Sequence, residues 1–290
     1  MTNPKAGNIA ASVKARLLNL SKIKQRPYLE ILQYYGMERF LYRLGKSDCQ
    51  DQFVLKGALL FHVWDLHDAR ATKDIDMLAK TNNSLENIIW IVRKICSQKV
   101  ACPDGIIFDE ESVKAEKMQS QREYEGIRIK FQGRLETTRI PMQIDLGFGD
   151  IVTPASINID YPTLLQLPAP DLRGYPVETL IAEKIHAMIE KGMFNSRMKD
   201  YHDVWLLLTG GYHREAVLEQ ALKRTFGQRN TKLNLAQLID DIERYGRAKD
   251  RQLLWQKHRQ DGQYEMVPQE LHHVCQDILQ GLKYLFVNNN

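Results

Sequence analysis

The distribution of prolines divides this chain of 290 residues into two parts with different patterns. Half of the ten prolines lie in one short stretch, at Pro154, Pro162, Pro168, Pro170 and Pro176. Proline fixes φ and lacks the backbone N–H that helix interiors and central strands need. We therefore expect an extended connection over residues 154–176, between one domain at 1–153 and another at 177–290.

Residues before this connection mix helical and strand patterns. Two segments, 124–131 and 140–146, alternate apolar and polar residues, and we expect them to form antiparallel strands joined near Gly133. Residues 74–78 (DIDML) indicate a further short strand. Helical spacing covers residues 13–20, 28–44, 53–64 and 84–97. The first domain is therefore predicted to be mixed α and β, with a small mixed or antiparallel sheet.

Residues after Pro176 show helical patterns to the end of the sequence. One apolar stripe, which includes Leu180, Ile185 and Met188, is stopped by Gly192. Further helical patterns cover residues 198–208, 214–226, 233–244 and 268–286. The predicted fold class is therefore α/β, of the α+β type, followed by an α-helical C-terminal lobe.

Composition restricts the class of protein and its compartment. Hydrophobic residues make up 43% and charged residues 26% of the chain, which excludes collagen-like and wholly disordered proteins. No apolar run approaches the roughly 18 residues of a membrane span, so we expect no membrane association. The four cysteines lack zinc-ligand spacing and no secretory signal is visible, so we expect free thiols and a cytoplasmic location.

Positive charge is concentrated near the N-terminus. The net charge is +4, yet residues 1–46 contain nine Lys and Arg residues against two acids, Glu30 and Glu38. A basic segment beside a near-neutral remainder is typical of a surface that binds a polyanion such as RNA. Charge alone more often describes a solvated helix face, and that alternative stays open.

Asp74 and Asp76 are the first candidates for chemistry. Alternate side chains of a strand share a face, so these two carboxylates are predicted to lie together while Ile75 and Met77 point into the core. Asp145 lies on the polar face of its own alternating strand. Three carboxylates from two strands could hold two Mg²⁺ ions for phosphoryl transfer. A lone Asp-x-Asp is more often a solvated strand end.

Lys56-Gly57-Ala58 is a candidate phosphate-binding turn. We expect it at the start of a helix, where backbone N–H groups bind phosphate and a small residue lets the phosphate approach. By itself, such a pair of Lys and Gly is usually only a turn.

Charged residues also gather around the helices after Pro176. Glu183 and Lys184 lie off the apolar stripe, and we expect both to project from the polar side of their helix. Four more crowd the start of the next helix: Arg197, Lys199, Asp200 and Asp203. Cations placed in this way could hold nucleotide phosphates. The alternative is a cluster of salt bridges that only caps the helix.

These motifs together resemble the AbiEii-type toxin nucleotidyltransferases, a family of the DNA polymerase β-like superfamily. FVLKGALLFHVWDLHDARATKDIDML is similar to the first motif, IPMQIDLGFGD to the second, and ETLIAEKIHAMIEKGMFNSRMKDYHDVW to the remaining two. The resemblance spans roughly residues 8–210. Two residues depart from the family pattern, because Ala58 replaces Gly or Ser and Lys199 replaces Arg.

The resemblance implies roles for particular residues. Asp74, Asp76 and Asp145 would hold two Mg²⁺ ions, and Asp145 would help to deprotonate the attacking hydroxyl. Lys184 and Asp200 would complete the catalytic set at an active site between the lobes, with Asp200 orienting either Lys184 or the incoming group. The nucleotide would be bound by Lys56, Gly57, Ala58, Arg70, Thr72, Lys184, Arg197, Lys199 and Asp203.

The resemblance also implies a function. The chain would be a Mg²⁺-dependent enzyme that transfers NMP from an NTP to an acceptor, the 3′ end of tRNA, as the toxin of a toxin–antitoxin pair. Its partners would be the NTP, tRNA and a separately encoded antitoxin. Two alternatives stay open: the same chemistry on a protein or small molecule, and a non-catalytic module that binds RNA or the antitoxin.

Overall fold

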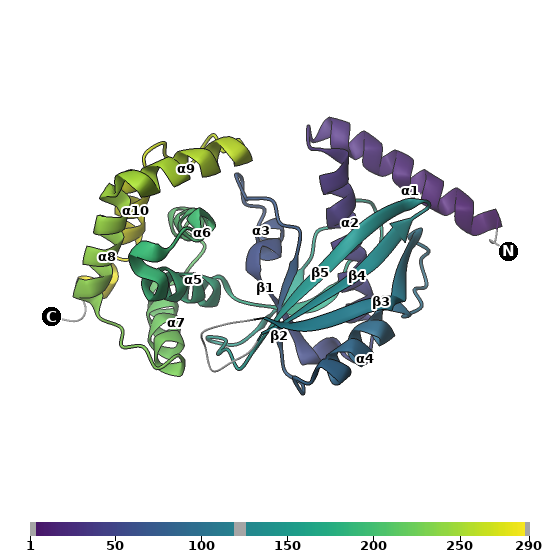
Figure 1. Ribbon diagram of the computed structural model, residues 1–290, viewed down its shortest axis with the longest axis horizontal. Helices are drawn as coiled ribbons and strands as arrows, with labels where there is room; N and C mark the ends of the chain where they lie inside the picture. Colours follow the sequence, from purple (N-terminus) through teal and green to yellow (C-terminus); the bar gives the residue numbers. More distant parts are fainter. Residues whose placement is uncertain (1–3, 119–125, 288–290) are drawn as a thin grey trace. The chain divides into compact units, whose positions relative to one another are not determined.

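The computed structural model describes residues 4–118 and 126–287, and these form two compact units. The sheet unit comprises the described residues of 1–63, 72–149 and 157–174. The helical unit comprises 64–71, 150–156 and the described residues of 175–290. Figure 1 shows the strands in blue to green and the C-terminal helices in green to yellow. Each unit is therefore built from segments that are distant in the sequence.

A seven-stranded mixed sheet forms the sheet unit, in the order β3-β4-β5-β2-β1-β7-β6. The strands are β1 (Phe53–Lys56), β2 (Ile75–Ala79), β3 (Ile106–Met118), β4 (Gly126–Leu135), β5 (Thr138–Phe148), β6 (Ile157–Asp160) and β7 (Asp171–Gly174). β2 runs parallel to β5 and β7 parallel to β1, and the other neighbours are antiparallel. The predicted fold class, with a mixed sheet, is confirmed.

β4 and β5 pair as predicted, but their turn lies elsewhere. Gly133 pairs with Ile140 inside the ladder, and the turn follows the last pair, Leu135 with Thr138. Glu136 takes the left-handed φ of 51° that this turn needs. Gly133 instead packs against the ring of Phe108, 3.2 Å from the position of an added Cβ. The start of the first predicted strand, at 124–125, lies outside the described residues.

Residues 154–176 form two strands, whereas the sequence predicted an extended connection. β7 lies between β1 and β6, with Leu172 buried. The prolines permit this because they lie outside both strands: Pro154 precedes β6, Pro162, Pro168 and Pro170 lie between β6 and β7, and Pro176 is the N-cap of the next helix. No ladder hydrogen bond of these strands is therefore lost to proline.

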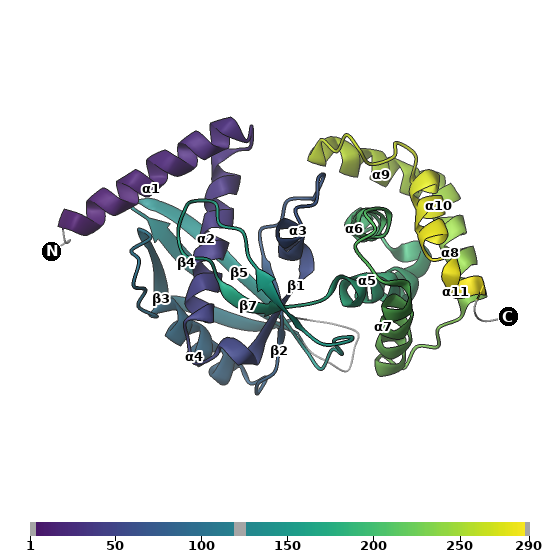
Figure 2. The same ribbon diagram turned by 180° about the vertical axis from the view of Figure 1, so that it is seen from behind.

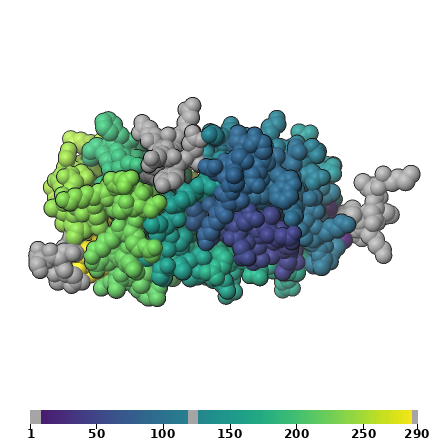
Figure 3. All heavy atoms as spheres, turned by 90° about the horizontal axis from the view of Figure 1, so that it is seen from below, coloured from purple at the N-terminus to yellow at the C-terminus, as the bar shows by residue number. Residues whose placement is uncertain are grey.

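Two helices cover one face of the sheet (Figure 2). α2 (Tyr28–Gly45) packs Phe40 against Phe131 of β4, with ring centroids 5.2 Å apart. α4 (Leu85–Cys96), capped by the Ser84 side chain, adds Val92 and Ile95 to the same apolar layer. The segment after α2 lies beside α4, where Lys94 binds Asp48 at 2.9 Å, and Figure 3 shows this face.

The remaining helices of the sheet unit are α1 (Pro4–Ile23), α3 (Leu60–Val63) and the 3-10 turns η1 (Gln50–Gln52) and η2 (Gly57–Leu59).

The helix predicted over residues 53–64 is wrong in its first part. Phe53, Val54 and Leu55 are all buried and form β1, which pairs with β2. An apolar run of this length fits a strand or a helix equally well by periodicity alone. Helical backbone begins only at Gly57, as η2 followed by α3.

The helical unit contains α5 (Val177–Lys191), η3 (Gly192–Phe194), α6 (Met198–Thr209), α7 (Glu215–Gln228), α8 (Leu235–Arg247), α9 (Lys249–Gly262), α10 (Leu271–Gly281) and α11 (Tyr284–Val287). α5 ends at Gly192 as predicted, where φ is +47°. The sequence did not indicate α9, which is polar around most of its circumference and buries Trp255. Across the part of the chain that the structure describes, no helix combines the length and apolar character needed to span a membrane.

Candidate functional site

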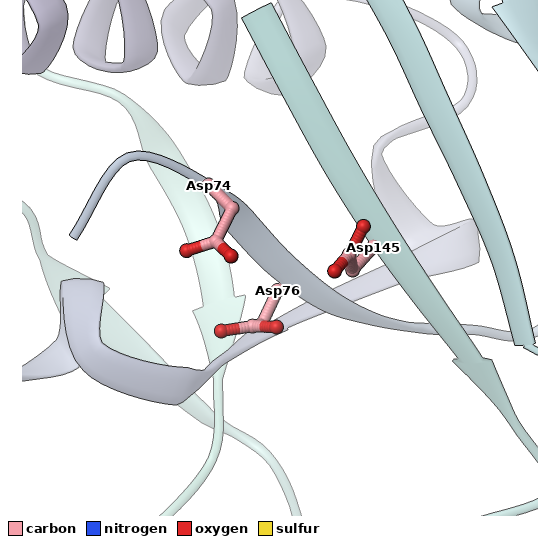
Figure 4. A group of neighbouring side chains, drawn as sticks. All are labelled: Asp74, Asp76 and Asp145. Atoms are coloured by element: carbon pink, nitrogen blue, oxygen red, sulfur yellow. The ribbon is translucent and has the colours of Figure 1, made fainter. Parts of the chain in front are cut away.

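Three carboxylates meet on the sheet unit, as the sequence predicted. Asp76 of β2 and Asp145 of β5 are direct partners in the parallel ladder, and Asp74 immediately precedes β2. One oxygen from each of the three lies within 4.8 Å of the others. Figure 4 shows the three side chains gathered beside the two strands. The arrangement offers an all-oxygen donor set for a divalent cation.

The alternation of the two strands places these carboxylates. Ile75 and Met77 flank Asp76 and are buried at 0% and 2% exposure. Met77 and Ile144 belong to the apolar layer beneath α2 and α4. Since successive side chains point to opposite faces, Asp76 and Asp145 project from the face that α2 and α4 leave open.

Gly57 allows Asp76 to occupy this position. Its φ is +73°, and a Cβ at this position would lie 2.1 Å from Oδ2 of Asp76. Its neighbour Lys56 is the direct cross-strand partner of Asp76. Ala58, the third residue of the turn, is buried at 2% exposure. The predicted phosphate turn therefore lies next to the carboxylates, and its glycine is required by Asp76 itself.

Thr72 holds Asp74. The Thr72 hydroxyl donates a hydrogen bond to Oδ1 of Asp74. The Thr72 backbone N–H donates to the hydroxyl of Tyr34 at 3.0 Å, and the Thr72 side chain is buried. This hydroxyl therefore orients a carboxylate of the site, which is a different contact from the phosphate contact that the resemblance implied.

Arg128 is a site residue that the sequence analysis missed. It lies opposite Asp145 in the antiparallel β4–β5 ladder. Its Nε donates to Oδ1 of Asp145 at 2.8 Å and its Nη2 donates to Oδ2 at 2.6 Å. Gln143 adds a longer contact from Nε2 to Oδ1, at 3.3 Å. The Asp145 carboxylate therefore lies in the site already bound to Arg128 in a bidentate ion pair.

A second group of predicted residues meets in the helical unit, around Lys184. Lys184 Nζ lies 2.6 Å from Oδ2 of Asp203 and 3.7 Å from Oδ1 of Asp200. Lys184 is only 9% exposed, so its ammonium lies against these two acids of α6 and not in solvent. Burial is possible because Asp203 of α6 supplies the opposite charge.

Arg70 completes the contacts of Asp203. Its Nε and Nη2 donate to this carboxylate at 3.0 and 3.1 Å, which ties the segment 64–71 to α6. Burial alone would raise the pKa of Asp203, but the charges of Lys184 and Arg70 lower that pKa to about 2. Asp203 is therefore a permanent anion that holds two cations in place.

Cations outnumber acids in this cluster. Arg197 binds Asp200 at 3.2 Å and is 45% exposed. Burial lowers the pKa of Lys199, and repulsion by Arg70 and Arg197 lowers it further. Four cations, Arg70, Lys184, Arg197 and Lys199, thus surround two carboxylates, Asp200 and Asp203. The excess positive charge favours an anionic ligand such as a triphosphate.

The predicted site residues therefore form two groups, one in each unit. The sheet unit holds Lys56, Gly57, Ala58, Thr72, Asp74, Asp76 and Asp145, and the helical unit holds Arg70, Lys184, Arg197, Lys199, Asp200 and Asp203. That both groups contact one nucleotide stays a prediction.

Comparison with known proteins identifies the family. Residues 39–277 match the family model described as "Nucleotidyl transferase AbiEii toxin, Type IV TA system". No curated protein matches the chain. The crystal structure of JHP933 from Helicobacter pylori is similar, with a TM-score of 0.52 and 14% sequence identity over 89% of this chain and 95% of that chain. This likeness shows a shared fold.

A second H. pylori structure, described as a candidate nucleotidyltransferase, has a TM-score of 0.48 and 14% identity over 88% of this chain and 96% of that chain. The family match covers most of the chain and includes every residue of both groups. The chain therefore belongs to the AbiEii family of nucleotidyltransferases, the toxins of type IV toxin–antitoxin systems.

Proposed function

We propose that this nucleotidyltransferase transfers the NMP part of an NTP to the 3′ end of tRNA in a Mg²⁺-dependent reaction. The observation that carries the proposal is the convergence of Asp74, Asp76 and Asp145, with oxygens within 4.8 Å of one another. Family membership supports an NTP substrate and an antitoxin partner. The resemblance to enzymes that modify the acceptor end of tRNA supports the choice of acceptor.

The donor set fits Mg²⁺. All three side chains offer carboxylate oxygens, which this hard cation prefers, together with phosphate oxygens and water. When bound, a pair of such ions would stabilise the attacking and leaving oxygens of a phosphoryl transfer. The carboxylates would hold the ions, while Gly57 and Thr72 keep Asp76 and Asp74 in position.

The proposed reaction is an in-line displacement at the α-phosphorus. The acceptor hydroxyl oxygen forms the new bond, the bond from the α-phosphorus to the bridging oxygen breaks, and pyrophosphate leaves with the electron pair. Asp145 is proposed to accept the proton of the attacking hydroxyl. The other proposed groups bind and orient the nucleotide.

The helical unit is proposed to bind the triphosphate. Lys184 is fixed by Asp203 and lies near Asp200, so its ammonium serves as a positioned point charge. Lys199 and Arg197 add positive charge beside it. Arg70 is proposed to act through Asp203, since its guanidinium is bound to that carboxylate.

The N-terminal basic segment supports an RNA substrate, over a narrower surface than the sequence indicated. Arg39 is buried against Glu38 at 2.8 Å, and Arg43 is buried against Asp104 at 2.7 Å. These two guanidinium groups therefore stabilise the sheet unit. Of the other exposed cations, Arg26 is bound to Glu30, and three are proposed to contact RNA phosphates: Arg16, Lys22 and Lys24.

Transfer of label tests this proposal. The chain is incubated with Mg²⁺, tRNA and each of the four NTPs labelled at the α-phosphate. We expect label to enter tRNA from at least one NTP, and tRNA with a periodate-oxidised 3′ end to accept none. Label that enters protein would support the same chemistry on a protein acceptor. Absence of label from every acceptor would contradict the proposed function.

A further inference from the structure

Arg128 occupies both oxygens of a carboxylate that the proposed function assigns to metal binding. The contacts of 2.8 and 2.6 Å form a bidentate fork between its guanidinium and Asp145. Arg128 is 36% exposed and Asp145 14% exposed at their side chains. The pair is therefore partly shielded from water, and screening by salt weakens it less than a surface pair.

The fork restricts how a cation can use Asp145. A carboxylate has two oxygens with about four lone-pair sites, and a bidentate arginine takes one site on each oxygen. A cation that binds Asp145 through both oxygens competes with the same guanidinium. A cation that binds through one oxygen lies close to a fixed positive charge.

Other charges along the same face also affect how tightly divalent cations bind. Direct cross-strand partners place Lys56, Asp76, Asp145 and Arg128 in one row across β1, β2, β5 and β4. With Asp74, the row provides three negative charges and a cation at each end. Two divalent ions would exceed these three charges, and the two cations add to the excess. The negative triphosphate of an NTP would restore the balance.

We propose that Arg128 is a positioning residue that competes with divalent cations for Asp145, so that the second metal ion binds only together with the nucleotide. The inference rests on the proposed function, because it concerns the same carboxylates. It predicts that the protein by itself binds divalent ions weakly. It also predicts that loss of the guanidinium creates tight metal binding without nucleotide.

Binding of Mn²⁺, followed by electron paramagnetic resonance in the absence of NTP, tests this proposal. We expect Arg128→Gln to bind Mn²⁺ at least about tenfold more tightly than the wild-type chain, because a cation in contact with a metal ligand is removed. Arg128→Lys keeps the charge but loses the fork, and we expect a gain of about threefold. The increase in Mn²⁺ affinity caused by Arg128→Gln should vanish when Asp145→Asn is added.

Lys130→Gln is the matched control. Lys130 lies two residues along β4 on the same face, but it binds Glu116 at 2.9 Å and is 57% exposed. Its removal deletes the same charge without touching Asp145, so we expect a change of less than about threefold. If Lys130→Gln increased the Mn²⁺ affinity as much as Arg128→Gln, the proposal would be overturned. The loss of one positive charge anywhere on this face would then explain both increases.

A second arm separates this proposal from the proposed function. With a non-hydrolysable NTP analogue, the wild-type chain should bind Mn²⁺ tightly, and Asp74→Asn should abolish this binding. If this holds while Arg128→Gln and Arg128→Lys gain nothing without nucleotide, the role of Arg128 is overturned alone. If no variant binds Mn²⁺ under either condition, both proposals are overturned. A melting curve for each variant establishes that it is folded. If Arg128→Gln does not fold, the Mn²⁺ affinity of Arg128→Lys is compared with that of the wild-type chain instead.

Discussion

Gly57 links backbone conformation to the carboxylate site. Its φ of +73° disfavours any side chain, and an added Cβ would meet Asp76 Oδ2 at 2.1 Å. We expect Gly57→Ala to lower kcat/KM on the order of 100-fold or more, because Asp76 must move out of the site. The same change should destabilise the fold by about 1–3 kcal/mol. Steady-state kinetics and urea unfolding measure the two effects.

Gly227→Ala provides the control for that substitution. Gly227 lies in α7, where an added Cβ meets nothing within 4 Å. We expect this variant to keep full activity and to gain about 0.5–1 kcal/mol in stability, since alanine favours the helix. Full activity in Gly57→Ala would show that Asp76 does not need the space beside Gly57.

Individual carboxylates were predictable from the sequence, whereas their ion pairs were not. Strand alternation is local, so it placed Asp74, Asp76 and Asp145 without any knowledge of the strand order. The pair of Arg128 with Asp145 depends on register. A turn at Gly133 would have paired Arg128 with another residue, and only the turn after Leu135 brings it to Asp145.

At the scale of elements, α6 and α9 meet through the buried His202 and the half-buried His258. Nδ1 of His202 lies 3.0 Å from Nε2 of His258, and burial lowers the pKa of His202 to about 4. A lowered histidine pKa means that the folded state binds fewer protons than the unfolded state. The contribution to stability is therefore present above the unfolded pKa of 6.5 and is lost as the pH falls towards about 4.

This pair predicts the acid sensitivity of the helical unit. Between pH 7 and pH 4.5 we expect the free energy of unfolding to fall by on the order of 2 kcal/mol through His202. His202→Asn should flatten this dependence, and His273→Gln, at an exposed position of α10, should leave it unchanged. Urea unfolding followed by circular dichroism across this pH range measures both. An equally steep dependence in His202→Asn would exclude the histidine pair as its cause.

The first helix carries a separate prediction about RNA. Arg16, Lys22 and Lys24 are exposed on α1 and the turn that follows it. If they bind phosphates, replacing all three by Gln should reduce the slope of log Kd against log salt by roughly two to three. NTP binding should remain unchanged. Filter binding of tRNA at several salt concentrations makes the comparison, and an unchanged slope would leave these residues as a solvated helix face.

Elements were predicted well where amphipathic spacing is regular. α2, α4, α5 and α6 began and ended close to the predicted residues. β1 was taken for part of a helix, because a short run buried on both sides has no periodicity. β7 was hidden by the prolines around it, since their positions outside the ladder depend on tertiary structure.

At the scale of the whole molecule, Lys184 decides whether the helical unit takes part in catalysis. We expect Lys184→Ala to weaken NTP binding and to lower activity at least about 100-fold. It should also destabilise the chain by on the order of 2–4 kcal/mol, since buried Asp203 loses a cation. Calorimetric titration with an NTP analogue and thermal unfolding record these effects.

The double variant Lys184→Met with Asp203→Asn separates the two roles of Lys184. Removing both charges should restore part of the stability, because no buried carboxylate is left short of a cation, while Arg70 loses its bound carboxylate in this variant. NTP binding should stay weak, since the ammonium is still missing. Recovery of NTP binding along with stability would assign Lys184 a purely structural role.

The most direct test of the whole account compares nucleotide transfer by Asp74→Asn, Asp76→Asn and the wild-type chain. Each variant keeps the shape of its side chain and loses one metal-binding charge. Asp51→Asn, at an exposed position of η1, is the control. We predict that the wild-type chain and the control transfer label from an NTP to tRNA, while both site variants are folded and lose on the order of 100-fold or more in rate. Full transfer by either site variant would contradict the account.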